Sequence, residues 1–331
     1  MDGAQALITT LDDLGIEYIF GYSGGAAIPI FDALETVKTK MKFILVRHEQ
    51  AATHAAEGYA RSTGKPGVVL VTSGPGATNA ITGITDALMD SIPMVVITGQ
   101  VPTSLIGSDA FQEADTVGIT RHCTKHNYLV KDPAKLGAVI HEAFHIATSG
   151  RPGPVVVDIP KDVQVATARY TNPGKIQHKT YRPALKPEPK SVETLVEMLA
   201  AAERPVLYTG GGIINSGPGA SQMLRELARI SGAPVTSTLM GLGAYPASGD
   251  QWLGMLGMHG TYEANMAMHG ADLIVCLGAR FDDRVTGRLD AFSPRSKKIH
   301  VDIDRSSINK TVRVDLGVVG DVGRVLEDAV K

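Results

Sequence analysis

Short runs of apolar residues alternate with helix-like segments along the first half of the chain, and this alternation restricts the fold more than any other feature. The runs are apolar at nearly every position, as expected for parallel strands that are covered on both faces. The pattern therefore predicts an α/β fold with a doubly wound parallel sheet. The predicted strands are 18–21, 43–46, 68–72, 94–98, 128–130 and 155–159, and the predicted helices are 4–14, 28–34, 50–62, 77–89 and 132–148.

A second β-α series follows a segment that is rich in proline and in basic residues. Residues 169–190 contain four prolines and six lysine or arginine residues, which predicts an extended linker. Ser191 is predicted to cap the next helix. Further strands are predicted at 206–208, 235–237, 273–277 and 299–303, with helices near 219–230 and 322–330. The sequence thus predicts a first domain at 1–168, a linker at 169–190 and a second parallel-sheet domain at 191–331.

Composition and charge exclude several classes of protein. Apolar residues make up 44% of the 331 residues and charged residues 20%, which suits a chain with buried cores rather than a disordered one. The 32 Lys and Arg residues against 34 Asp and Glu residues give a net charge of −2, which disfavours a general nucleic-acid binder. The chain begins without signal-peptide features, and its apolar runs are far shorter than the ~20 residues of a membrane span. These features predict a soluble, cytoplasmic protein without a membrane segment.

Two patterns that could bind zinc are rejected. The two cysteines, Cys123 and Cys276, are too few for a disulfide framework or a cysteine zinc cluster, and they are predicted to be buried free thiols. The segment from His141 to His145 matches the H-E-x-x-H pattern of zinc proteases. On a helical wheel, however, both histidines lie opposite the apolar face, so this segment is predicted to be a surface helix whose histidines face solvent.

Two glycine-rich segments follow predicted strands and open predicted helices. In Gly74-Pro75-Gly76-Ala77-Thr78-Asn79, Asn79 stands where a dinucleotide-binding loop has its third glycine, and Gly210-Gly211-Gly212 follows strand 206–208. Both segments are expected to place backbone N–H groups at a helix N-terminus, where an anion is stabilised. A strand-to-helix turn without a ligand explains each pattern equally well.

A glutamate follows another strand directly. Arg47-His48-Glu49-Gln50 comes straight after strand 43–46, at the carboxyl end of a parallel strand, where such sheets bind ligands. A carboxylate at that depth is expected to be partly desolvated, which favours its neutral form and suits proton transfer. From the spacing alone, a glutamate that simply starts a helix is the favoured explanation.

Eight ordered segments carry a resemblance to a known family. In the first half they are Gly21-Tyr22-Ser23-Gly24-Gly25-Ala26, Arg47-His48-Glu49-Gln50-Ala51-Ala52, Thr72-Ser73-Gly74-Pro75-Gly76-Ala77-Thr78-Asn79 and Asp109-Ala110-Phe111-Gln112-Glu113-Ala114-Asp115. In the second half they are Met240-Gly241-Leu242-Gly243, Leu256-Gly257-Met258-His259-Gly260-Thr261, Arg280-Phe281-Asp282-Asp283-Arg284-Val285-Thr286-Gly287 and His300-Val301-Asp302-Ile303-Asp304. Over essentially the whole chain, they resemble the catalytic subunit of acetohydroxyacid synthase (acetolactate synthase), a thiamine-diphosphate enzyme of branched-chain amino-acid synthesis.

The resemblance implies catalytic roles for four residues. Glu49 resembles the glutamate that hydrogen-bonds N1′ of the cofactor's aminopyrimidine and so promotes loss of the thiazolium C2 proton. Gly25 lies in a segment similar to the loop that faces the thiazolium, where a missing Cβ permits close approach. Phe111 and Gln112 match positions on the substrate side of the same site.

The resemblance also implies a central domain that binds FAD, with a mainly structural role for the flavin. One departure from the family pattern is Ser23, which stands where the family usually has proline and removes no chemical group. The positions implied to bind FAD are Arg151, Gly211, Gly212, Leu239, Met240, His259, Gly260, Thr261, Gly278, Arg280, Asp282, Arg284, Asp302, Ile303 and Asp321.

Family members carry a third domain that binds the diphosphate through Mg²⁺, with a Gly-Asp-Gly segment followed by an asparagine. In this sequence Gly249-Asp250 continues as Gln251-Trp252 and departs from that pattern. The resemblance therefore implies Mg²⁺ as a cofactor, predicts no metal ligand within this chain and predicts that the chain is an incomplete form of the enzyme.

The implied reaction decarboxylates pyruvate and joins the two-carbon unit to pyruvate or 2-ketobutyrate, giving 2-acetolactate or 2-aceto-2-hydroxybutyrate. A homodimer or homotetramer is expected, and the sequence leaves a small regulatory subunit open. One alternative is another thiamine-diphosphate carboligase, such as sulfoacetaldehyde acetyltransferase or glyoxylate carboligase, although glyoxylate carboligase lacks the glutamate that matches Glu49. The other is a non-catalytic module that binds FAD or an adenine nucleotide.

Overall fold

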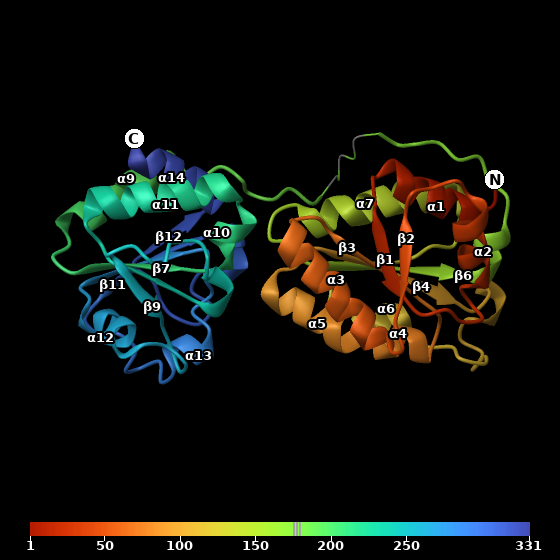
Figure 1. Cartoon of the computed structure of the whole chain (residues 1–331), viewed down its shortest axis with the longest axis horizontal. Coiled ribbons are helices and arrows are strands. Elements are labelled where there is room, and N and C mark those ends of the chain that lie inside the picture. Colours follow the sequence, from red (N-terminus) through yellow and green to blue (C-terminus); the bar gives the residue numbers. More distant parts are fainter. Residues whose placement is uncertain (175, 177, 179) are drawn as a thin grey trace. The chain divides into compact units, whose positions relative to one another are not determined.

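The chain forms two compact units, Met1–Tyr181 and Arg182–Lys331, in a computed structural model that describes residues 1–174, 176, 178 and 180–331. Each unit is built on one six-stranded sheet, and neighbouring strands run parallel in both sheets. Helices cover both faces of each sheet (Figure 1). The predicted fold class, α/β with two parallel-sheet domains, is confirmed. Residues 175, 177 and 179 of the predicted linker lie outside the described residues.

The sheet of the N-terminal unit has the strand order β2-β1-β3-β4-β6-β5. Every residue of β3, β4 and β6 is buried, which explains why these segments are apolar at nearly every position. The edge strand β2 is mostly exposed. The strands are β1 (Tyr18–Gly21), β2 (Lys42–Leu45), β3 (Gly67–Val71), β4 (Met94–Gln100), β5 (His126–Leu129) and β6 (Pro154–Pro160).

Alternate residues of these strands point to opposite faces and build two separate cores. On one face, α1 (Gly3–Asp13), α2 (Ile28–Thr36) and α7 (Leu136–Thr148) pack on strand residues such as Leu70 and Ile97. On the other, α3 (Glu49–Thr63) and α5 (Ile81–Asp90) pack on residues such as Val69 and Val96. Shorter helices complete the unit: α4 (Pro75–Asn79), α6 (Thr116–Thr120), α8 (Lys161–Val165) and the 3-10 turns η1 (Thr103–Leu105) and η2 (Pro133–Lys135).

The C-terminal unit repeats this architecture with the strand order β12-β11-β10-β7-β8-β9. Its strands are β7 (Pro205–Thr209), β8 (Val235–Ser237), β9 (Trp252–Met255), β10 (Leu273–Leu277), β11 (Lys297–Asp302) and β12 (Leu316–Val319). Its helices are α9 (Pro189–Ala201), α10 (Gly211–Asn215), α11 (Pro218–Ser231), α12 (Tyr262–Gly270), α13 (Asp283–Thr286) and α14 (Val322–Val330), with 3-10 turns at η3 (Leu239–Gly241) and η4 (Arg305–Ser307).

Three predicted helices differ in detail from the structure. The helix predicted at 132–148 begins with the 3-10 turn η2 and continues as α7. The helix predicted at 77–89 is divided at Ala80 into α4 and α5, and the Ala80 amide donates to the Ala77 carbonyl in a tight last turn of α4. The prediction that Ser191 caps a helix is wrong. Glu188 is the N-cap of α9 and Pro189 takes the first helical position, where its fixed φ suits the helix and its missing N–H costs nothing.

The prediction that His141 faces solvent is also wrong. His141 is only 9% exposed, and burial lowers its pKa, with Asp13 acting in the opposite direction. A helical wheel cannot reveal cover from a distant segment. Here Tyr170 lies over Gly137 of α7, and the Tyr181 hydroxyl donates to the Ser149 carbonyl at 2.7 Å, so residues from the predicted linker cover this side of the helix.

The cysteines and the membrane prediction can also be compared with the structure. Cys123 and Cys276 are buried and free, as predicted. None of the helices in the described part of the chain combines the length and the apolar character needed to cross a membrane.

We predict that replacing Ile97 with alanine destabilises the N-terminal unit by about 2–5 kcal/mol, because a buried strand side chain leaves a cavity. Leu45→Ala on the exposed edge strand is the matched control and should change stability by no more than about 0.5 kcal/mol. Urea unfolding followed by circular dichroism measures both variants. Trp252, the only tryptophan, lies in the C-terminal unit and reports on that unit separately. Equal effects of the two substitutions would contradict the assigned core.

Candidate functional site

The carboxyl ends of β1 and β3 form the switch point of the N-terminal sheet. These strands are neighbours, yet the loop after β1 leads to α2 on one face and the loop after β3 leads to α4 and α5 on the other. Parallel sheets bind ligands in the crevice beside such a point. Thr72 joins the two loops, because its Oγ1 accepts a hydrogen bond from the Ala26 amide at 3.2 Å. A methyl carbon at Gly24 would lie 2.5 Å from Thr72 Cγ2, so this approach requires glycine at position 24.

Glu49 lies at this edge of the sheet, at the first position of α3. The chain passes from β2 into α3 through His48, whose Nδ1 accepts a hydrogen bond from the Gln50 amide at 3.2 Å. Glu49 is 8% exposed. The Asn79 side-chain amide donates to Glu49 Oε2 at 2.9 Å. The sequence analysis missed Asn79 as a partner of Glu49, although its side-chain amide in place of a third glycine was a usable signal.

Two glycines lie in the segments that follow β1 and β3. A methyl carbon at Gly76 would lie 2.7 Å from Thr72 Cγ2, which requires glycine there, and 3.6 Å from Glu49 Oε1, so the Glu49 carboxylate lies against α4. Gly25 is exposed, and a methyl carbon placed there would meet no described atom within 4 Å. The site is therefore open on the side of Gly25.

The loop between η1 and α6 carries Phe111 and Gln112. Gln112 has a φ of 56°, in the left-handed region that non-glycine residues rarely adopt. A methyl carbon at Gly74 would lie 2.4 Å from the Gln112 carbonyl oxygen, so the two loops are in direct backbone contact. Phe111 is 88% exposed. The fold thus brings Gln112 to the switch point and leaves the Phe111 ring accessible.

Glu113 closes this loop on itself. Its carboxylate accepts hydrogen bonds from the amides of Gly107 and Ala110. These two hydrogen bonds hold the pKa of Glu113 below its usual range. The turn that carries Phe111 and Gln112 is therefore stabilised by a carboxylate in its ionised form.

A buried carboxylate on β6 ties the same loop to the sheet. Asp158 accepts hydrogen bonds from Thr98 Oγ1 at 2.6 Å and from Gln100 Nε2 at 2.9 Å, and Gln100 Nε2 also donates to the Ala114 carbonyl at 2.9 Å. Burial raises the pKa of Asp158 to about 7, the charge of Asp115 adds to the rise, and the two hydrogen bonds oppose it. The sequence analysis missed Asp158 because it lies within an otherwise apolar strand.

The switch point of the C-terminal sheet lies between β7 and β10. The chain continues from β7 to β8 and β9 on one side, and from β10 to β11 and β12 on the other. Gly212 donates its amide to the Gly278 carbonyl at 3.0 Å. A methyl carbon at Gly212 would lie 2.7 Å from Gly278 Cα, and Gly278 has a φ of 65°. Gly211, between Gly210 and Gly212, faces Met240, whose Cβ would lie 3.3 Å from a methyl carbon there.

Charged residues follow β10 at the same edge. Arg280 and Asp282 form an ion pair of 3.3 Å, and Asp282 caps α13 by accepting from the Arg284 amide at 3.0 Å. The Arg284 carbonyl accepts from the Met258 amide at 2.8 Å, which joins α13 to the segment before α12.

The segment before α12 carries three more predicted residues. Thr261 caps α12, and its hydroxyl donates to the Leu253 carbonyl at 2.6 Å. The Gly260 amide donates to the Gly257 carbonyl at 2.9 Å, and His259 is exposed. Leu239, in η3 after β8, is also exposed.

Two aspartates lie at or just after the carboxyl ends of β11 and β12. Asp302 is buried at the carboxyl end of β11, and its Oδ1 accepts from the Asp304 amide at 2.8 Å, with Ile303 half-buried between them. Asp321 caps α14 and accepts from the Ser216 hydroxyl at 2.7 Å, which joins α10 to α14.

Arg151 belongs to the N-terminal unit, whereas the other positions implied to bind FAD belong to the C-terminal unit. Its Nε donates to the Ser91 hydroxyl at 2.8 Å and its Nη2 to the Leu88 carbonyl at 3.4 Å. These contacts show how its own unit holds Arg151, and its role toward FAD stays a prediction.

Two family models match the chain and define its class. Residues 1–119 match the thiamine pyrophosphate enzyme, N-terminal TPP binding domain, and residues 192–329 match the thiamine pyrophosphate enzyme, central domain. Together with the two parallel sheets and the glutamate at the first switch point, these matches identify the chain as a member of the thiamine pyrophosphate enzyme family.

Within this family, the chain is similar over its whole length to acetolactate synthases. It is 53% identical over 333 residues to the acetolactate synthase large subunit of Buchnera aphidicola subsp. Acyrthosiphon pisum and 52% identical over 329 residues to the acetolactate synthase isozyme 3 large subunit of Escherichia coli. It is also 52% identical over 330 residues to the acetolactate synthase of Mycobacterium bovis. These alignments cover 99–100% of the chain and 58%, 57% and 53% of the three relatives. The resemblance found in the motifs is confirmed, and the chain spans little more than half the length of these relatives.

The raised pKa of Asp158 predicts that the N-terminal unit loses stability as the pH rises from about 4 to about 7. In this interval the unfolded chain has already released the Asp158 proton while the folded chain retains it, so a rise in pH favours unfolding. A pKa raised from 3.8 to about 7 corresponds to about 4 kcal/mol over the whole interval.

Urea unfolding at pH 4.5 and pH 7 measures this loss. Asp158→Asn should show a smaller loss between the two pH values than the wild type, whereas Asp132→Asn, at an exposed aspartate, should match the wild type. The same loss in all three proteins would contradict the assignment.

Proposed function

We propose that this chain provides the pyrimidine-binding and FAD-binding parts of an acetolactate synthase large subunit. The complete enzyme decarboxylates pyruvate and transfers the two-carbon unit to a second 2-keto acid, pyruvate or 2-ketobutyrate, to form 2-acetolactate or 2-aceto-2-hydroxybutyrate. The observation that carries the proposal is the buried Glu49 carboxylate at the switch point of the N-terminal sheet, anchored there by Asn79.

The surroundings of Glu49 fit the aminopyrimidine of thiamine diphosphate. Asn79 holds Oε2, and no hydrogen bond reaches Oε1 from the described residues, so Oε1 is available to a ring nitrogen of the cofactor. When bound, thiamine diphosphate supplies the electron sink for decarboxylation. Glu49 holds and moves a proton at the pyrimidine N1′, and its burial strengthens this hydrogen bond because little water competes for it.

Gly25, Phe111 and Gln112 are assigned to the space around the reacting atoms. The open side at Gly25 supports close approach of the thiazolium ring, because no Cβ occupies it. The exposed Phe111 ring offers an apolar contact for the small side chain of a 2-keto acid. Gln112 offers a side-chain amide from a backbone that Gly74 and Glu113 hold in place.

We assign FAD to the switch point of the C-terminal sheet, with a structural rather than a redox role. The close contact of Gly212 with Gly278 leaves the β7–α10 turn free of side chains, which suits the approach of a dinucleotide. Arg280 and Arg284 provide positive charge for its phosphates. The residues assigned to FAD are Arg151, Gly211, Gly212, Leu239, Met240, His259, Gly260, Thr261, Gly278, Arg280, Asp282, Arg284, Asp302, Ile303 and Asp321.

Mg²⁺ is assigned to the diphosphate of the cofactor, and no residue of this chain is proposed as its ligand. We further propose a cytoplasmic enzyme that assembles as a homodimer or homotetramer and binds a small regulatory subunit.

Replacing Glu49 with glutamine, in a complete subunit that carries this sequence, should slow exchange of the C2 proton of bound thiamine diphosphate by about 10²–10⁴. Glutamine keeps the shape of the side chain but cannot accept and return a proton. Exchange is followed by NMR, with acetolactate formation from pyruvate as the second readout. Glu35→Gln, at an exposed glutamate on α2, should change neither. Exchange at the wild-type rate in Glu49→Gln would refute the catalytic role.

The chain itself should bind added FAD, and Arg280→Ala should weaken binding by about 10- to 100-fold, the usual range for loss of a charge-assisted hydrogen bond. Titration of flavin fluorescence gives the dissociation constants. Arg229→Ala is the control, because Arg229 pairs with Glu226 on α11, away from the β7–β10 switch point. A chain that binds no FAD, or equal affinities for the two variants, would refute the flavin site.

A further inference from the structure

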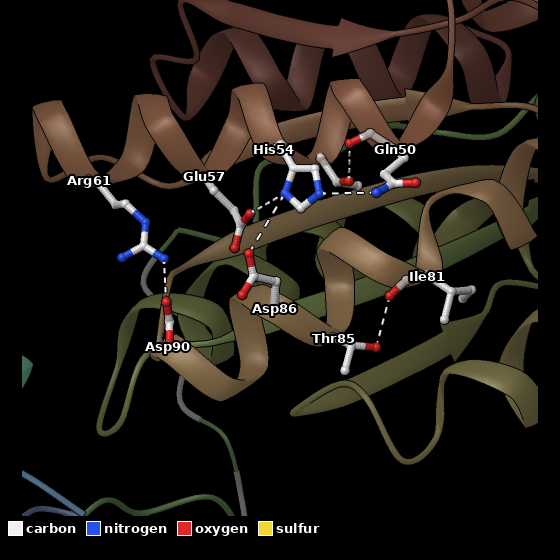
Figure 2. A network of polar contacts seen from close by, with 9 residues as sticks. Gln50, His54, Glu57, Arg61, Ile81, Thr85, Asp86 and Asp90 are labelled. Atoms are coloured by element: carbon white, nitrogen blue, oxygen red, sulfur yellow. Dashed lines mark hydrogen bonds and ion pairs between the residues drawn. The ribbon is translucent and has the colours of Figure 1, made fainter. Parts of the chain in front are cut away.

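A cluster of metal-ligating side chains joins α3 and α5, outside the residues assigned to thiamine diphosphate and FAD. His54 and Glu57 lie three residues apart on α3, so both side chains project from the same face of the helix, and Asp86 lies on α5 (Figure 2). His54 Nδ1 is 2.8 Å from Glu57 Oε2 and 3.8 Å from Asp86 Oδ2. One nitrogen and two carboxylate oxygens thus lie within 4.8 Å of one another.

Glu57 is the buried member of this cluster, and its carboxylate is only partly satisfied. Its side chain is 5% exposed, and Oε1 is enclosed without a hydrogen-bond partner. Figure 2 shows the Glu57 and Asp86 carboxylates pointing toward each other below the His54 ring. A buried carboxylate oxygen without a donor or a cation carries a free-energy cost, and a cation held between these groups would remove it.

The surrounding charges favour a cation as well. Arg61 Nη2 is 2.7 Å from Asp90 Oδ2, so the nearest guanidinium shown in Figure 2 is engaged by a third carboxylate. The charge of Arg61 also acts on Glu57, but Glu57, Asp86 and Asp90 together carry three negative charges against one on Arg61 and at most one on His54. A divalent ion would balance the two carboxylates.

The ring of His54 can present the nitrogen that a metal requires. Binding through Nδ1 places the ring proton on Nε2, which lies 3.4 Å from the side-chain nitrogen of Gln50. A 180° flip of the Gln50 side-chain amide places its oxygen there instead, and this oxygen can accept the Nε2 proton. Metal-bound histidines are commonly oriented by such an acceptor.

We propose that His54, Glu57 and Asp86 bind a divalent transition-metal ion of the Zn²⁺ type. One imidazole nitrogen and two carboxylate oxygens suit Zn²⁺ and similar ions, whereas Mg²⁺ prefers oxygen ligands only. His54 and Asp86 are 41% and 48% exposed, which leaves room for water ligands and for the side chains to close to the ~2.0–2.2 Å of zinc coordination. The bound ion links α3, which begins at Glu49, to α5.

Titration of the metal-free chain with ZnCl₂ and CoCl₂ tests this proposal. Calorimetry should find one Zn²⁺ per chain. Bound Co²⁺ should give the visible absorption of an ion with a low coordination number. His54→Ala and Asp86→Asn should each weaken Zn²⁺ binding by at least about 10-fold. Even the loss of a residue that only hydrogen-bonds to a metal ligand lowers metal affinity by about 10- to 100-fold.

Two control variants keep the test specific. Glu35→Gln changes an exposed glutamate on α2, and His269→Ala removes an exposed histidine of the C-terminal unit. Both should bind Zn²⁺ as the wild type does. Asp86 is half-exposed, so Asp86→Asn should fold normally, which circular dichroism without metal verifies. Absence of stoichiometric binding, or unchanged binding in His54→Ala and Asp86→Asn, would overturn the proposal and leave the thiamine and FAD assignments untouched.

Discussion

A carboxylate can be buried only where hydrogen-bond donors or a cation compensate for lost water, and the hydrogen bond from Asn79 to Glu49 meets this requirement. The geometry depends on the short helix α4, which ends at Asn79 and is separated from α5 at Ala80. A methyl carbon at Gly76 of this helix would lie 3.6 Å from Glu49 Oε1, so the carboxylate lies directly against α4. The loops after β2 and β3 therefore define the position of Glu49 together, and the proposed proton transfer depends on that position.

Buried carboxylates recur in the N-terminal unit, and each is compensated differently. Asp158 receives hydrogen bonds from Thr98 and Gln100 within the sheet and retains a raised pKa. Glu57 meets His54 through one oxygen and leaves the other without a partner. The surroundings of the second oxygen distinguish Glu49 from Glu57. Oε1 of Glu49 is not among the enclosed atoms and is available to a cofactor for proton transfer, whereas Oε1 of Glu57 is enclosed beside a histidine, which suits a metal ion.

Much of the fold could be predicted from the sequence, because buried parallel strands are apolar at nearly every position. The sequence analysis missed two strands, β9 and β12, for local physical reasons. Both contain a glycine, which is depleted in strands, and β9 pairs with β8 through an irregular register. Glu49 could be located because it follows a strand directly. The sequence drew attention to Asn79 but not to its contact with Glu49. That contact and the cover over His141 both depend on segments that are distant in the sequence.

The most direct test of the account is the nitrogen NMR signal of thiamine diphosphate labelled with ¹⁵N at N1′, bound to a complete subunit that carries this sequence. If Glu49 hydrogen-bonds N1′, the signal should move away from that of the free cofactor toward that of a protonated pyrimidine. The shift should disappear in Glu49→Gln. A bound cofactor whose N1′ signal matches the free cofactor in the wild type, or is the same in both proteins, would contradict the central role of this carboxylate.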